Sequence, residues 1–400
     1  LPSTELVAAI IISSHDAQMA GLLKLLQAAQ LQEGLRQHIL WKANCGSLDT
    51  MRHILKFCMD ENLFRFSSVI QAFLSWIGLG LRTEKPKNIK QCAMLAYECL
   101  VDGDKRQEYL QSANNLEAYL ALWAQGCQEI SLAKPMVQSL LDDPRPHRQV
   151  LGWFFISSSG DPRDQMTIAG NYLHIRDEEP LAWIIHNLNA TWDLLRTALW
   201  DDHLCQTAQS FPNENLPDSI AERRNLFQAL WEVAQFIGTR KRTFTGNPFD
   251  FIRVTLENAP VLDCMISLAG YDKDSEMIAQ LLQLPHLMSP QQRRILIRAL
   301  LTPESEPTHR AFLHSMLRDR SVHVREQAAA RLSACTLLPE DLNQLMESLG
   351  TKGGAVRKTV LSILQAQPSA VRSSLITQLL DAQEEALNQG GIELLLLEKD

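Results

Sequence analysis

The chain has 400 residues, of which 46% are hydrophobic and 21% charged, an ordinary composition for a soluble protein. Its formal net charge of −8 argues against a surface devoted as a whole to nucleic acid or anionic membrane, because such surfaces need an excess of lysine and arginine. No apolar run reaches the length of about 18 residues that a membrane helix needs. The apolar opening LPSTELVAAIIISS has no basic residue before it and does not resemble a signal peptide. We therefore expect a cytoplasmic protein that does not bind membranes.

Apolar residues recur at helical spacing along most of the chain, and polar stretches rich in Pro, Gly, Asn or Asp interrupt them. The predicted helical segments are 5–30, 31–45, a pair within 48–79, 91–101, 105–125, 127–142, 165–175, 179–200 and 219–237. Loops are expected at 82–90, 157–164, 210–218 and 238–250. No segment alternates with period two for long enough to make a sheet, so the sequence predicts an all-α fold.

Eight cysteines are scattered singly within these helical patterns, which predicts reduced, buried thiols rather than disulfides. They are Cys45, Cys58, Cys92, Cys99, Cys127, Cys205, Cys264 and Cys335.

The C-terminal part contains a repeating pattern, here called the frame, which is clearest in the stretch 318–332, RDRSVHVREQAAARL. Val324, Ala328 and Leu332 lie four residues apart and so along one stripe of a helix, with Arg325 beside the first. The frame recurs at intervals of about 32 residues: Pro260, Cys264 and Leu268; Gln292, Leu296 and Leu300 with Arg293; Val356, Val360 and Leu364 with Arg357; and Leu387, Gly391 and Leu395. A fixed period of this length indicates stacked helix pairs, that is, an α-solenoid.

This stretch combines an aspartate (Asp319), a Val-Arg step and an Ala-rich helix, a pattern that resembles HEAT repeats of the short bacterial type. That resemblance implies a right-handed superhelix of helix pairs, armadillo-like in its broad architecture. It also implies structural roles for Asp319, Arg293, Arg325 and Arg357, because such arginines pair with an aspartate or a carbonyl of the neighbouring turn.

Residues 22–79 resemble the N-terminal part of a family of large bacterial proteins named after a supposed molybdate metabolism regulator (MolR-like proteins). The resemblance rests on QLQEGLR at Gln30–Arg36 and FRFSSV at Phe64–Val69. Those proteins are largely uncharacterised and carry helical repeats followed by a further domain. The resemblance implies that this chain is the repeat region of a larger protein. A C-terminal domain of that larger protein is then one possible partner.

The longest predicted loop divides the chain. All eight tryptophans precede it, and the 32-residue frame follows it. We therefore expect an irregular helical-repeat region at 1–237, a linker loop at 238–250, and regular HEAT-like repeats at 251–400.

Motifs for catalysis are absent from the sequence: it has no Gly-rich phosphate loop, H-E-x-x-H, G-x-S-x-G or C-x-x-C. Two groups of potential metal ligands occur, Asp201, Asp202, His203 and Cys205, and His309, His314 and His323. Neither has the spacing of a recognised site, so ordinary structural roles are favoured. The sequence predicts no enzyme activity, cofactor or metal.

Basic residues give a candidate binding face. Residues 286–335 contain eight arginines, no lysine and four acids, a net charge of +4 in an acidic chain. The candidates are Arg294, Arg298, Arg318 and Arg320, with Arg240, Lys241 and Arg242 in the long loop. Arginine forks suit phosphate or carboxylate, although a solvated face is the simpler interpretation.

Three functional classes remain. The first is a non-catalytic protein–protein interaction scaffold with an unidentified protein partner, since a superhelix presents a long surface with exchangeable side chains. The second is nucleic-acid binding through the arginine-rich repeats, against which the net charge weighs. The third is the regulatory region of an enzyme whose active domain lies outside this chain. We favour the scaffold.

Overall fold

The computed structural model describes residues 4–13, 16–28, 33–43, 47–79, 88–128, 130–159, 162–188, 217–249, 252–304, 306–349 and 354–397. These residues are almost entirely helical, as predicted. The chain divides into two compact units: unit 1 is Leu1–Asn187 with Arg242–Leu256, and unit 2 is Leu188–Lys241 with Glu257–Asp400. Among the described helices, none combines the length and the apolar character needed to cross a bilayer.

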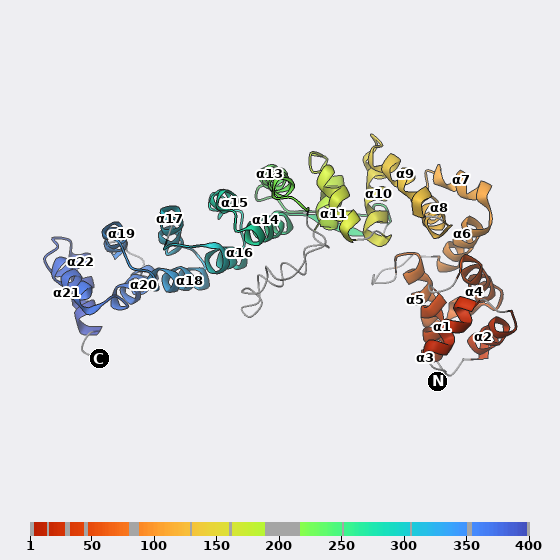
Figure 1. Ribbon diagram of the computed structural model, residues 1–400, viewed down its shortest axis with the longest axis horizontal. Helices are drawn as coiled ribbons and strands as arrows, with labels where there is room; N and C mark the ends of the chain where they lie inside the picture. The colour runs from red at the N-terminus through yellow and green to blue at the C-terminus, as the bar shows by residue number, and fades with distance from the viewer. Residues whose placement is uncertain are drawn as a thin grey trace. The chain divides into compact units, whose positions relative to one another are not determined.

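Unit 1 is a series of short helices that pack on their sequence neighbours (Figure 1). They are α1 (Thr4–Ser13), α2 (Asp16–Ala28), α3 (Glu33–Lys42), α4 (Leu48–Asp60), the 3₁₀ turn η2 (Leu63–Arg65), α5 (Ser67–Trp76), α6 (Ile89–Val101), α7 (Gly103–Leu110), α8 (Asn115–Gln128), α9 (Ile130–Leu141), α10 (Pro146–Ser159) and α11 (Pro162–Asn171). Residues 178–188 are also helical. Helix α3 contacts α1, α2 and α5, and α8 contacts α6, α7, α9 and α10. The expected loop at 157–164 is shorter than predicted, because α10 continues through its serines.

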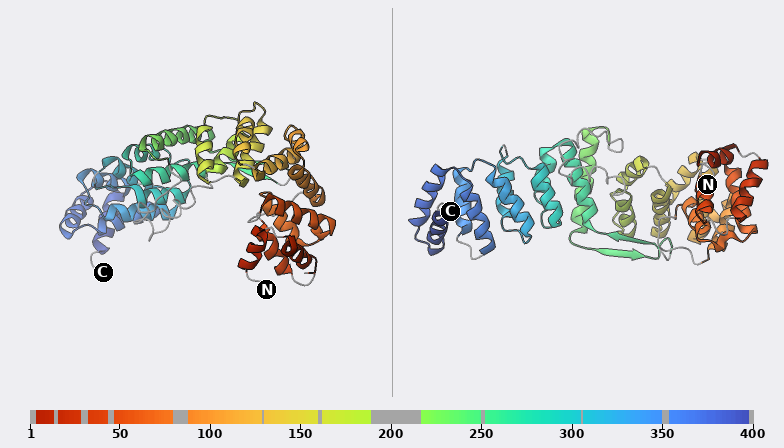
Figure 2. Two further views of the ribbon diagram at one scale, coloured as in Figure 1. Left: turned by 45° about the vertical axis from the view of Figure 1, so that its right-hand side comes forward. Right: turned by 90° about the horizontal axis from the view of Figure 1, so that it is seen from below.

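A β-hairpin begins in the predicted linker, 238–250, and ends in the predicted repeat region, although the sequence predicts no sheet. Strand β1 (Arg242–Thr245) pairs antiparallel with β2 (Arg253–Leu256), and both appear as arrows in Figure 2. The expectation that no sheet forms is wrong here. Strands of four residues are too short to produce a visible alternation of apolar and polar residues.

The hairpin belongs to unit 1 through the residues between its strands. Phe249 packs edge-on against Tyr119 and Phe154, with ring centroids 5.5 and 5.3 Å away. Asn115 donates a hydrogen bond from Nδ2 to the carbonyl of Pro248 at 3.0 Å. The segment 242–256 is thus anchored to α8 and α10 of unit 1.

Unit 2 is built from helices, and seven of those described begin at a fixed interval. They are α13 (Ile220–Ile237), α14 (Asn258–Asp272), α15 (Ser275–Leu281), α16 (Pro290–Ile295) continued by the π-helical turn η4 (Leu296–Leu300), α17 (Pro307–Met316), α18 (Val322–Ser333), α19 (Pro339–Leu349), α20 (Gly354–Gln365), α21 (Ser369–Leu380) and α22 (Glu385–Leu397). Helices α14, α16, α18 and α20 begin 32 residues apart, and so do α15, α17 and α19. This interval is the one at which the Val-Arg frame recurs in the sequence.

The helices of unit 2 lie in two rows. Helices α13, α15, α17 and α19 form one row in Figure 1, and α14, α16, α18 and α20 form the other. Helix α18 contacts α16 and α20 in its own row and α17 in the opposite row, and α17 contacts α19. The view from below in Figure 2 shows the same helices side by side. The core of unit 2 therefore continues from one helix pair to the next.

The repeat frame marks the buried stripe in four of its five predicted units. Val324, Ala328 and Leu332 on α18 are completely buried. The second and third frame positions of three other units are buried as well: Cys264 and Leu268, Leu296 and Leu300, and Val360 and Leu364. A spacing of four residues thus identified the face of each helix that the neighbouring helices cover.

The last predicted unit departs from the frame. Leu395 is 39% exposed, whereas its neighbour Leu394 is completely buried. Gly391 explains the difference, because a Cβ there would lie 3.0 Å from Leu379 Cβ and 3.1 Å from the backbone nitrogen of Leu380. Helix α22 therefore packs on α21 through a glycine, which turns Leu394 rather than Leu395 inward.

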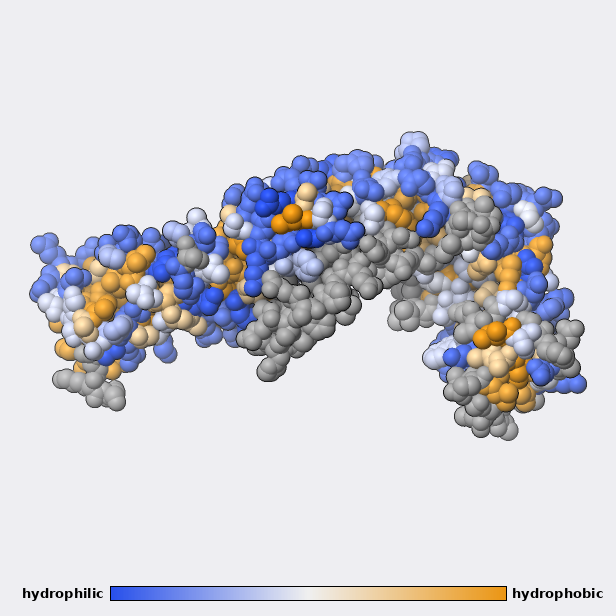
Figure 3. All heavy atoms as spheres, in the orientation of Figure 1, coloured by the Kyte–Doolittle hydropathy of each residue, from blue (hydrophilic) through white to orange (hydrophobic). Residues whose placement is uncertain are grey.

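Helix α22 also has the densest group of exposed apolar side chains among the described residues: Ile392, Leu395, Leu396 and Leu397. In Figure 3 the orange surface at the C-terminal end of unit 2 lies over α21 and α22.

We expect Gly391→Ala to lower the free energy of unfolding by about 1–3 kcal/mol, because the added methyl group overpacks the contact between α22 and α21. Gly354→Ala is the matched control, since a Cβ there meets nothing within 4 Å. Urea unfolding of both variants measures the difference. Equal stability of the two variants would contradict the close approach of α22 and α21.

Candidate binding surfaces

Arg293 on α16 is tied to the connection that precedes α18. Its Nε lies 2.7 Å from Oδ2 of Asp319, and its Nη2 donates to Oδ1 at 3.0 Å. Both side chains are largely buried, at 13% and 7% exposed. Asp319 also accepts a hydrogen bond from the backbone N–H of Ser321 at 2.8 Å. One carboxylate therefore fixes the start of α18 and links it to the previous helix pair.

The other two arginines of the frame also bond to acids or carbonyls. Nη1 of Arg325 donates to the carbonyl of Asp319 at 2.7 Å. Nε of Arg357 lies 3.1 Å from Glu393, and its Nη1 donates to the carbonyl of Ala386 at 3.0 Å. Arg293 and Arg357 reach the next helix pair, whereas Arg325 bonds to the turn before its own helix. The three arginines therefore bond to an acid, a backbone carbonyl, or both.

Asp341 forms a second buried tie, between α17 and α19. Its Oδ2 lies 2.6 Å from Nη1 of Arg310, and its Oδ1 lies 2.9 Å from Nε2 of His314. Burial alone would raise the pKa of Asp341. Hydrogen bonds from the Leu338 N–H, His314 and Arg310 outweigh burial and hold that pKa below its ordinary value of 3.8.

The predicted binding face in unit 2 comprises arginines with different surroundings. Arg294 and Arg298 are half-buried, and Arg318 and Arg320 are exposed. Arg294 donates to Gln291 at 3.4 Å, and Arg318 donates to Ser348 at 3.2 Å. The side chain of Arg320 makes no polar contact with a described residue.

The three basic residues of the predicted loop are already paired. Lys241 lies 2.5 Å from Glu257, and Arg242 lies 2.6 Å from Glu178. Arg240 donates from Nε to the carbonyl of Ile237 at 3.0 Å, at the end of α13. Arg242 belongs to unit 1 and the other two belong to unit 2. Two of these charges are thus balanced by an acid.

The histidines considered as metal ligands have separate partners. Nδ1 of His309 accepts a hydrogen bond from the Thr302 N–H at 3.0 Å, His314 bonds to Asp341, and His323 lies 3.5 Å from Glu326. Within the described ranges no three His, Cys, Asp or Glu side chains are placed to hold a metal ion. The other predicted group, Asp201, Asp202, His203 and Cys205, lies outside the described residues.

Unit 1 contains a site that the sequence did not suggest, at the end of α5. The helix ends in a Schellman motif, in which the Leu79 N–H donates to the Leu74 carbonyl and the Gly78 N–H to the Ser75 carbonyl. Gly78 has φ of +76°, a conformation that favours glycine. A Cβ there would lie 2.9 Å from Cβ of Ser158 on α10. The end of α5 therefore lies directly against α10.

Aromatic side chains bond to the last carbonyls of α3 and α5. Nε1 of Trp123 donates to the carbonyl of Trp76 at 2.8 Å, and the hydroxyl of Tyr119 donates to the carbonyl of Ile77 at 2.6 Å. Nε1 of Trp76 in turn donates to the carbonyl of Leu40 at 3.1 Å. These bonds satisfy carbonyls that a helix end leaves unpaired, and they fix the orientation of both indoles.

A cleft of about 740 Å³ lies beside these indoles. Its lining residues come from α5, α8, α9, α10 and α11: Ser75, Trp76, Ile77, Gly78, Trp123, Gly126, Cys127, Ala133, Lys134, Val137, Gln138, Leu141, Phe155, Ile156, Ser158 and Ile168. Lys134 is the single charged residue in this described lining. Burial raises the pKa of Cys127 to about 11, so its thiol is neutral at pH 7.

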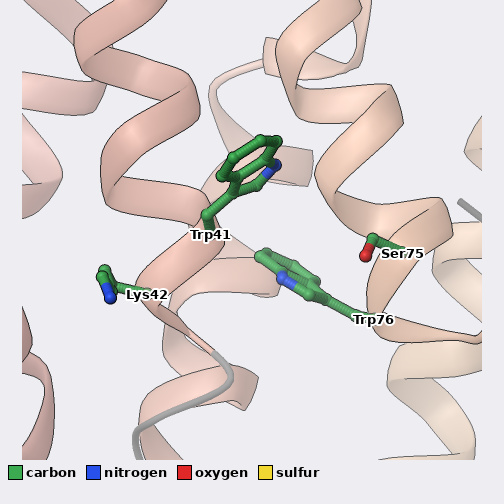
Figure 4. A pocket seen from close by; sticks show the side chains of 4 residues that line it. All are labelled: Trp41, Lys42, Ser75 and Trp76. Atoms are coloured by element: carbon green, nitrogen blue, oxygen red, sulfur yellow. The ribbon is translucent and has the colours of Figure 1, made fainter. Parts of the chain in front are cut away.

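A smaller pocket of about 300 Å³ shares Ser75 and Trp76 with the cleft. Trp41 and Lys42, at the end of α3, complete its lining. Figure 4 shows the two indoles one above the other, with Lys42 on the α3 side and Ser75 on the α5 side. Trp41 is 60% exposed.

Comparison with known proteins places the chain without assigning an activity. A family model described as a family of unknown function, DUF5724, matches residues 1–400. The chain belongs to DUF5724. No curated protein matches this DUF5724 chain. An engineered protein of known crystal structure aligns with 100% of this chain and 92% of its own, at 12% identity and a TM-score of 0.24, which carries no argument about fold or function.

We expect Arg293→Ala to lower the free energy of unfolding by about 2–4 kcal/mol, because it leaves the carboxylate of Asp319 without its buried cation. The matched control, Arg320→Ala, removes an exposed arginine and should change stability by less than about 0.5 kcal/mol. Urea unfolding at low and high salt measures both. An equal, small loss in the two variants would show that the Arg293 ion pair is not a structural tie.

The depressed pKa of Asp341 predicts an acid-sensitive contribution to stability. The contribution is complete above the ordinary pKa of 3.8 and is lost as the pH falls through the lower pKa of the folded state. Asp341→Asn should therefore weaken the dependence of stability on pH below about pH 4, and it should also lower stability at pH 7. Urea unfolding between pH 7 and pH 3, with the exposed Asp381→Asn as control, measures this. A pH dependence equal to that of the unmodified chain would contradict the prediction.

Proposed function

We propose that this DUF5724 chain is a non-catalytic protein–protein interaction scaffold, built as an α-solenoid of HEAT-like helix pairs. The observation that carries the proposal is the recurrence of helix starts every 32 residues together with polar ties between successive pairs in unit 2. Seven side chains bond to residues of earlier or later repeats that lie 26 to 36 residues away, about one repeat each. They are Gln292, Arg293, Arg310, His314, Arg318, Arg331 and Arg357.

Such an arrangement favours binding over a long surface. In a stack of repeats each pair contacts only its neighbours, so the stack grows in one direction and its exposed side chains can vary without loss of the core. The same property predicts that binding depends on several repeats together rather than on a single residue. Following the resemblance of residues 22–79 to MolR-like proteins, we also propose that the scaffold is part of a larger bacterial protein.

The alternatives lead to different outcomes in one experiment. Nucleic-acid binding needs free cationic groups, and two residues of the candidate face, Lys241 and Arg242, are already paired with acids. A regulatory region of an enzyme would bind its own active domain instead of a separate partner.

The functional test is affinity capture from bacterial lysate with the 400-residue chain as bait, with and without nuclease. The recovered proteins are identified by mass spectrometry and then purified and tested for direct binding. A partner that binds directly after nuclease treatment, and more weakly when one helix pair is removed, supports the scaffold. Recovery that disappears with nuclease overturns it in favour of nucleic-acid binding. Recovery of nothing overturns it in favour of a domain of the same protein.

The repeat architecture makes a separate prediction about deletions. Removing residues 275–306 takes out α15, α16 and η4, one 32-residue interval, and joins Asp274 to Pro307. Asp274, which accepts from the N–H groups of Glu276 and Met277, would then cap α17 instead of α15. We expect a less stable chain that is still helical and monomeric and that unfolds cooperatively, because the remaining pairs keep their neighbours.

The control deletion removes residues 275–289 and joins Asp274 to Pro290, so the junction is again Asp-Pro. It removes one helix instead of a pair and moves α16 into the row of α15. We expect loss of helicity or aggregation, seen by circular dichroism and size-exclusion chromatography. If the 15-residue deletion is tolerated as well as the 32-residue one, the repeat interpretation is wrong.

A further inference from the structure

The smaller pocket of unit 1 is bordered by two tryptophan side chains that do not touch each other. Trp41 and Trp76 lie one above the other (Figure 4). These two described rings make no contact with each other, whereas the rings of Tyr119 and Phe154 in the same unit lie 5.2 Å apart. The pocket, here called the indole pocket, is lined by Trp41, Lys42, Ser75 and Trp76.

The size of the indole pocket suits a small ligand. Its volume of about 300 Å³ lies at the lower end of the range of about 300–1,000 Å³ that ligand pockets occupy. We infer that this pocket binds a small molecule with a planar aromatic ring and one anionic group, such as an aromatic carboxylate. This binding function goes beyond the proposed scaffold and does not depend on it.

The two indoles favour a flat ring as the ligand. Aromatic rings attract one another in offset-stacked or edge-to-face arrangements, in addition to the gain from burying apolar surface. Trp76 is only 8% exposed, and its Nε1 donates to the carbonyl of Leu40 at 3.1 Å, so its ring is held in place before a ligand arrives. Trp41 is largely exposed, so a ligand ring packed on it removes apolar surface from water. One wall is thus fixed, and the other gains burial on binding.

The polar residues of the lining decide between an anion and a cation, because an indole face by itself also attracts cations. Lys42 is the single charged residue of the described lining, and it makes no hydrogen bond or ion pair with a described residue. Its ammonium group attracts an anion and repels a cation. Ser75 is exposed, and its hydroxyl, which has no partner among the described residues either, can donate a hydrogen bond to a carboxylate.

The first experiment compares three probes by isothermal titration calorimetry of the 400-residue chain at pH 7.5. The probes are 2-naphthoate, which is planar and anionic, 2-naphthylmethylamine, which is planar and cationic, and decahydro-2-naphthoate, which is anionic but not planar. We expect one-to-one binding of 2-naphthoate and about fivefold weaker binding of each of the others, because each lacks one of the two interactions. If the amine or the saturated acid binds as tightly as 2-naphthoate, or if 2-naphthoate does not bind, the proposal is overturned.

Substitutions in the pocket separate the ring from the charge. Trp41→Ala should weaken 2-naphthoate about tenfold, and Lys42→Gln should weaken it about fivefold and reduce its advantage over the amine. The matched controls lie on α2: Leu25→Ala removes an apolar side chain that is 43% exposed, and Lys24→Gln removes an exposed lysine. Both controls should leave binding unchanged. Ser75→Leu, which fills the pocket from α5 without altering either indole, should also abolish binding. Circular dichroism checks that each variant keeps its helicity. Unchanged binding in Trp41→Ala and Ser75→Leu would place the ligand elsewhere and overturn the assignment.

Fluorine NMR of the chain labelled with 5-fluorotryptophan locates the bound probe. The resonance that is missing from Trp41→Phe identifies Trp41 among the eight tryptophans. 2-Naphthoate should shift this resonance through its ring current, with the same dissociation constant that calorimetry gives. Shifts confined to other resonances would contradict the proposed site. The scaffold proposal is unaffected by either result, because its test measures protein partners and repeat deletions.

Discussion

The ion pair between Arg293 and Asp319 is the constraint on which the regular part of the chain depends. A helix pair of this size cannot bury its apolar stripe alone, so it must lie on its neighbours at a fixed distance. Apolar contacts have little direction and tolerate sliding. A forked arginine held by a buried carboxylate has strict geometry, and here it connects α16 to the first residue of the turn that starts α18. Packing thus supplies the stability of the stack, and the polar ties fix its register.

The regular fold could be predicted because its signals are local. Val324, Ala328 and Leu332 are close in sequence, and so are the arginine and aspartate that accompany them. The residues with which these arginines bond in the neighbouring repeats were harder to identify from the sequence. Glu393 bonds to Arg357 from a helix in which the frame fails, because Gly391 lets α22 approach α21 and so changes which leucine is buried. Whether a helix packs closely through a glycine depends on the backbone of the neighbouring helix. The spacing of residues in the sequence does not give that information.

The cleft and the hairpin could not be predicted for a related reason. The cleft combines α5 with α8 to α11, which are separated by up to about a hundred residues, and its lining looks like ordinary core in the sequence. The only local sign was the glycine at position 78. Its actual role is to end α5 and to admit Ser158. Phe249 likewise reads as a loop residue, although it completes the aromatic core around Tyr119 and Phe154.

The polar contacts between helices differ between the two units. From α14 to α20 in unit 2, corresponding helices begin every 32 residues, and Arg293 and Arg310 reach acids 26 and 31 residues away. In unit 1 the separations are as different as 19 residues, for Arg106 with Gln125, and 48, for Arg52 with Leu100. Large aromatic side chains in unit 1 bond to carbonyls near helix ends. Trp123 and Tyr119 do so at the end of α5, and Trp76 does so at the end of α3. Trp76 and Trp123 make these backbone bonds and also line the cleft, so the rings that satisfy the helix-end carbonyls form part of its apolar wall.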